Sequence, residues 1–140
     1  MGAWGHGSFE NDTALDWVSE LTERRGFFVF KKAGGFSVLE KALEVVPDTP
    51  LDADAGSEAL AAAEVIAALM GKGRDCLPKE LAEWVSNAQP VDVEPLRTKA
   101  LKALDAVLSE DSELRELWEE SEDFEAWKSD VEGLRSLLKS

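Results

Sequence analysis

Apolar residues recur every three or four positions along most of the chain, and charged residues separate them. The repeat is strongest near the C-terminus, from about Asp123, where Phe124, Trp127, Val131 and Leu134 follow one another. Such spacing places apolar side chains on one face of an α-helix. It predicts further helices over about 12–25, 37–46, 58–70, 78–88, 93–108 and 113–118. The pattern therefore predicts an all-α fold, a single compact bundle of about six or seven helices.

Helix boundaries are indicated by residues that can cap a helix end. Asn11 is a good N-cap for the first helix because its side chain can accept a backbone N–H, and Gly26 is a good C-cap. For the later helices we predict these N-caps: Asp54 or Ser57 before the third, Asp92 before the fifth, and Ser112 before the sixth. Residues 27–35 are rich in phenylalanine and glycine, and we expect an extended or irregular connector there.

The third predicted helix, 58–70, is apolar around nearly its whole circumference, which is typical of a helix packed on several sides. Glu64 is its one internal charge. It can lie at the edge of the buried face, or it can be a buried acid that serves a ligand. The three aspartates of the preceding loop, 47–57, do not match the calcium-loop spacing, and a capping role is favoured.

The chain is strongly acidic, with 29 acidic and 15 basic residues among 140 and a formal net charge of −14. Nine acidic residues and one arginine lie between positions 110 and 125. Such a charge repels nucleic acid and anionic membranes and favours a basic protein surface. The candidate partner-binding residues are Glu110, Asp111, Glu113, Glu116, Glu119 and Glu120. The alternative is that these residues only form a solvated face that keeps the protein soluble.

The sequence gives little support for a disulfide-bonded, metal-binding, secreted or membrane protein. The single cysteine, Cys76, excludes an internal disulfide and a multi-cysteine zinc site, so we expect no metal and no cofactor. The first 25 residues lack the pattern of a secretory signal, and the longest apolar run is too short to cross a bilayer. We expect a cytoplasmic protein with no membrane partner. The oligomeric state stays open.

The first seventeen residues, MGAWGHGSFENDTALDW, contain three glycines, two tryptophans and the only histidine. Glycines permit unusual backbone angles, so this stretch predicts a shaped loop before the first helix. The candidate ligand-binding residues are Trp4, His6, Asp12, Asp16 and Trp17, together with Glu64 of the third helix. The structural alternative is that Trp4 and Phe9 anchor the loop to the bundle while Asn11 and Asp12 begin the helix. No catalytic set stands out.

Residues 2–17 resemble the opening signature of the domain of unknown function 4259 family, G-x-W-G-x-G-x-F-x-N-D-x-A-x-D-[FW]. The resemblance continues in Ser57–Leu69, Lys102–Leu108 and Ser112–Ser121, followed by Trp127. It implies a small, mainly helical bacterial domain with no established activity, and it transfers no catalytic residue. His6 occupies a variable position of the signature.

Two hypotheses of function follow. The first is a non-enzymatic protein-binding or regulatory module, such as an immunity-like protein, because residues 106–140 carry eleven acids against four bases. The second is a small-molecule binding protein or hydrolase-type enzyme with a site under the N-terminal loop.

Overall fold

The computed structural model describes residues 9, 11–27, 39–44, 50–72, 77–88 and 93–139. The helices are α1 (Asp12–Phe27), α3 (Ala53–Leu69), α4 (Lys79–Ala88), α5 (Glu94–Val107), α6 (Glu113–Glu119) and α7 (Phe124–Lys139), and residues 39–43 are also helical. The predicted all-α bundle is confirmed. The described residues contain no strand, only an isolated β-bridge. The glycine-rich N-terminal loop lies outside the described residues, apart from the buried Phe9.

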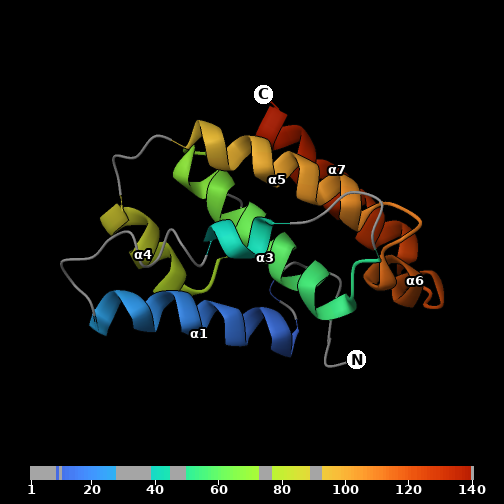
Figure 1. Cartoon of the computed structure of the whole chain (residues 1–140), viewed down its shortest axis with the longest axis horizontal. Coiled ribbons are helices and arrows are strands. Elements are labelled where there is room, and N and C mark those ends of the chain that lie inside the picture. The colour runs from blue at the N-terminus through green and yellow to red at the C-terminus, as the bar shows by residue number, and fades with distance from the viewer. Residues whose placement is uncertain are drawn as a thin grey trace.

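The helices are arranged around α3, which contacts α1, α4, α5, α6 and α7. Figure 1 shows α1 along one side of α3 and the antiparallel pair α5 and α7 along the other. Most side chains of α3 are small, and its consecutive residues Ala59 to Ala67 are all buried. Alanine has no side chain beyond Cβ, so neighbouring helices can approach the α3 backbone closely from several directions. The prediction that this helix is packed on several sides is confirmed.

The predicted start of α3 was wrong. The helix begins at Ala53, five residues before the expected Glu58, and its N-cap is Asp52 rather than Asp54 or Ser57. The Asp52 side chain accepts a hydrogen bond from the backbone N–H of Ala55 at 2.7 Å. Asp54 lies in the first turn, where its charge complements the positive end of the helix dipole.

Other predicted boundaries are partly confirmed. The Asn11 side chain accepts the N–H of Ala14 at 2.8 Å, and the Ser112 hydroxyl accepts the N–H of Arg115 at 3.2 Å, so both N-caps are correct.

The helix α1 continues through Gly26 and ends at Phe27, so Gly26 is not its C-cap. Val93, not Asp92, is the N-cap of α5, and Pro95 in the first turn favours the helical start. The 39–43 helix ends before Glu44 rather than at Val46.

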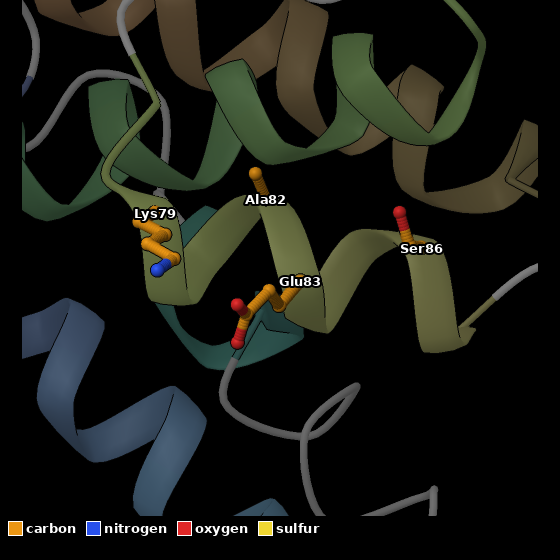
Figure 2. Close-up of a pocket in the computed structure, with 4 residues that line it drawn as sticks. All are labelled: Lys79, Ala82, Glu83 and Ser86. Carbon is orange, nitrogen blue, oxygen red and sulfur yellow. The ribbon is translucent and has the colours of Figure 1, made fainter.

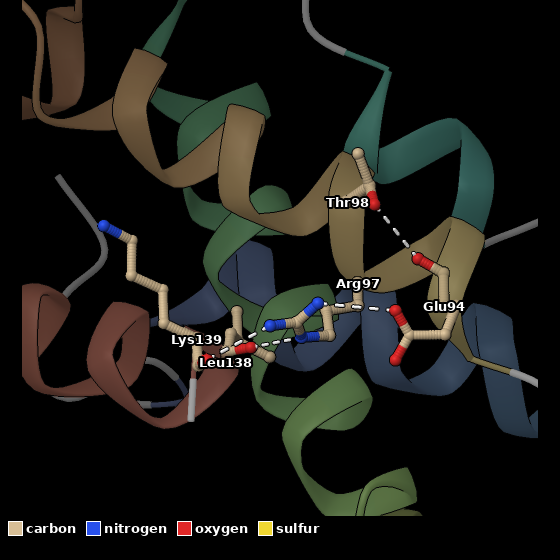
Figure 3. Close-up of polar contacts among 5 residues, drawn as sticks. All are labelled: Glu94, Arg97, Thr98, Leu138 and Lys139. Carbon is tan, nitrogen blue, oxygen red and sulfur yellow. Dashed lines mark hydrogen bonds and ion pairs between the residues drawn. The ribbon is translucent and has the colours of Figure 1, made fainter.

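Two arginines join α5 to α7. The Arg97 guanidinium donates to the backbone carbonyls of Leu138 and Lys139 and lies 3.4 Å from a Glu94 carboxylate oxygen (Figure 3). Arg135 on α7 contacts Asp105 on α5 at 2.6 Å. The carbonyls at a helix C-terminus lack partners within the helix and carry partial negative charge, so Arg97 both satisfies and neutralises the end of α7.

The start of α3 is also fastened to the start of α6. The backbone N–H of Leu51 donates to the carbonyl of Asp111 at 2.9 Å, and the N–H of Glu113 donates to the carbonyl of Leu51 at 2.8 Å. Next to this bridge, α6 lies so close to Gly56 that a Cβ there would be 3.2 Å from both Cβ and Cδ2 of Leu114. A side chain at Gly56 would therefore fit only if Leu114 shifted by a few tenths of an ångström.

We expect Gly56→Ala and Gly133→Ala to change stability in opposite directions, although both glycines are helical. Gly133 is exposed on α7, and its replacement should raise the free energy of unfolding by about 0.5–1 kcal/mol through helix propensity alone. At Gly56 the added methyl group meets the buried Leu114, so the free energy of unfolding should fall by about 1 kcal/mol. Urea denaturation followed by circular dichroism measures both. Equal stabilisation by the two variants would contradict the close packing of α3 against α6.

Candidate functional site

The acidic surface is the set Glu110, Asp111, Glu113, Glu116, Glu119 and Glu120, which covers α6 and the turns on either side of it. All six residues are exposed. The opposite face of α6 is buried, because Leu114 and Trp118 pack into the core. Since residues three and four apart share a helix face, burial of these two directs the carboxylates at the intervening positions to solvent.

The acidic surface is held on a well-anchored helix. Ser112, fully buried, caps α6, and the backbone bridge to Leu51 fixes the turn before it. The Glu113 carboxylate accepts the backbone N–H of Ala53 at 2.9 Å, which ties α6 to the first turn of α3. One carboxylate of the surface therefore has a structural role, and the others are presented on a backbone that is already ordered.

The single arginine of this region turns inward instead of neutralising the surface. Arg115 donates to the backbone carbonyl of Leu108 at 2.7 Å, and its guanidinium lies 5.9 Å from the centre of the Phe124 ring. Its distance to the Glu119 carboxylate is 3.9 Å, close to the limit for an ion pair. A cation held against a carbonyl and an aromatic face contributes to joining α5, α6 and α7, and it leaves the outer face negative.

Stacked aromatic rings pack at the buried face of α6. The ring centres of Trp118 on α6 and Trp127 on α7 are 6.3 Å apart, with 11° between their planes. Phe124 is tilted against Trp127 with ring centres 6.1 Å apart. Offset aromatic pairs of this kind contribute beyond the area they bury. They fix the orientation of α6, and hence of its carboxylates, relative to α7.

Four carboxylates of the acidic surface, those of Glu110, Asp111, Glu116 and Glu120, have no ion-pair partner within the described part of the chain. Nor do they converge on one point: the described residues contain no group of three or more His, Cys, Asp or Glu side chains placed to hold a metal ion. A dispersed set of exposed carboxylates is suited to a broad basic surface rather than to a coordinated ion.

The second candidate set, proposed for a small ligand, is divided between surface and core. Asp12 and Asp16 are exposed on α1, where they lie one helical turn apart. Trp17 and Glu64 are buried, with 3% and 1% of their surface exposed. Glu64 therefore lies inside the bundle and not at the edge of the buried face. Trp4, His6 and Cys76 lie outside the described residues.

Trp17 has one unusual feature. Its indole Nε1 is buried and has no hydrogen-bond partner among the described residues. A buried donor without a partner costs free energy, and such donors are rare in folded proteins. Within the described ranges, this N–H favours a polar ligand near α1.

A shallow surface depression of about 300 Å³ lies on the outer face of α4, lined by Lys79, Ala82, Glu83 and Ser86. Figure 2 shows these four side chains on α4, and all four residues are exposed. No motif in the sequence singled them out, because isolated polar residues on an exposed helix face are common. The lining holds one cation and one carboxylate four residues apart, an arrangement typical of a solvated helix surface.

The family model for a domain of unknown function, DUF4259, matches residues 2–130. The chain belongs to the DUF4259 family. The match includes α1 to α6 and the first half of α7, so the acidic surface and α3 are both parts of the DUF4259 domain. No curated protein and no solved structure shows significant similarity to the chain. Among the described residues of this DUF4259 protein, no helix has the length and apolar character needed to cross a membrane.

Proposed function

We propose that this DUF4259 protein is a non-enzymatic, single-domain binding or regulatory module, and that its acidic surface contacts a basic protein. The observation that carries the proposal is the unneutralised outer face of α6, where Arg115 is turned inward and Glu110, Asp111, Glu116 and Glu120 stay without ion-pair partners in the described residues. An immunity-like protein, which covers a basic surface of another protein, is one form that such a module takes.

A basic protein fits this surface better than nucleic acid or an anionic membrane. Phosphates would be repelled by the carboxylates and by the formal net charge of −14. Complementary charge accelerates encounter and orients the partners, and salt weakens it. We place the protein in the cytoplasm, in keeping with its single cysteine.

The test is affinity capture from the native host with the folded protein as bait, at low salt and at 1 M salt. At 1 M salt, exposed charges more than about 3 Å apart are largely screened from one another. The bait is compared with a variant carrying Glu110→Gln, Asp111→Asn, Glu116→Gln and Glu120→Gln. Glu113 and Glu119 are kept because they contact Ala53 and Arg115. We expect a basic protein to be retained at low salt, with its affinity reduced about tenfold or more in the variant, equivalent to about 1.4 kcal/mol.

The matched control neutralises four other exposed carboxylates, those of Glu40, Glu44, Glu80 and Glu83. These residues lie on the 39–44 segment and on α4, well separated from α6 (Figure 1). Both variants change the net charge by the same amount. Full binding by the control and loss in the α6 variant would support a local contact, whereas equal loss in both, or retention by both, would overturn the proposal.

A small-molecule binding protein or hydrolase-type enzyme is the competing proposal, and the buried Trp17 indole N–H favours it. A polar ligand that accepts this hydrogen would remove the cost of the unpaired donor. Trp17 and Glu64 are its buried members, and Asp12 and Asp16 its exposed ones.

Native mass spectrometry of protein purified from its host tests the ligand directly. If the competing proposal holds, the wild type carries a bound small molecule of defined mass, and Trp17→Phe, which lacks the N–H but keeps an aromatic ring, loses most of it. The unbound mass for both proteins, each correctly folded by circular dichroism, would count against a ligand on Trp17.

A further inference from the structure

We draw no further inference here: the strongest candidate, the shallow depression on the outer face of α4 lined by Lys79, Ala82, Glu83 and Ser86, carries no proposal because nothing in the described part of the structure shows what covers it.

Discussion

Replacement of Trp127 by alanine is expected to lower the free energy of unfolding by about 3–5 kcal/mol, a large part of the stability of a domain of this size. Trp127 is 1% exposed, and it contacts Trp118 and Phe124 where α6 and α7 meet. Truncation removes the largest fully buried side chain of the described core and leaves a cavity beneath α6. Urea denaturation followed by far-ultraviolet circular dichroism measures the loss.

A double-mutant cycle with Trp118→Ala separates the stacking contact from general loss of volume. If the rings stack as observed, the two substitutions together should cost less than the sum of their separate effects, by about 0.5–1.5 kcal/mol. Strict additivity would mean that Trp118 and Trp127 act independently. In that case the support for α6, and for the orientation of its carboxylates, would have to be revised.

The helices of this protein could be predicted because their signals are local. Asn11 and Ser112 cap α1 and α6 through bonds to residues three positions on, and the apolar repeat of α7 buries Trp127, Val131 and Leu134 as expected. The start of α3 could not be predicted in this way. Asp52, Asp54 and Ser57 all qualify as N-caps, and the choice depends on distant contacts, since Leu51 is bridged to the turn before α6.

For the charges of the candidate site, too, the sequence reveals the local pattern but not the tertiary contacts. The sequence predicts an acidic stretch at 110–125 because composition alone reveals it. It does not reveal that Arg115 is turned toward Leu108 and Phe124. Nor does it reveal that the Glu113 carboxylate accepts the backbone N–H of Ala53, sixty residues away along the chain. Which carboxylates stay available is decided by tertiary contacts, so no spacing rule along the chain could identify them.

The ligand set illustrates a further limit of the sequence. Asp12, Asp16 and Trp17 are close together along the chain, but the helical turn sends Trp17 into the core and the two carboxylates to solvent. Glu64 is a candidate because it is the one internal charge of an apolar helix, a signal that allows an edge position or a buried one and says nothing about its neighbours. Proximity in sequence on a helix is therefore no evidence that Asp12, Asp16 and Trp17 share one site.

The central position of α3 leads to the second large expected effect. Ala61, Ala62 and Ala63 are each 0% exposed, and consecutive residues of an α-helix are about 100° apart around its axis. These three positions therefore sample more than half of the helix circumference. We expect Ala61→Leu, Ala62→Leu and Ala63→Leu each to lower the free energy of unfolding by about 1–3 kcal/mol, because all three positions are fully buried and the added atoms meet packed neighbours.

The control is Ala82→Leu on the exposed face of α4, where the same added volume extends into solvent and stability should change by no more than about 0.5 kcal/mol. Alanine and leucine have similar helix propensities, so overpacking alone separates the two outcomes. An ordinary amphipathic helix, buried on one face, would accept leucine at one or more of three consecutive positions. Tolerance at any of them would contradict the enclosure of α3, whereas destabilisation at all three requires neighbours on several sides of the helix.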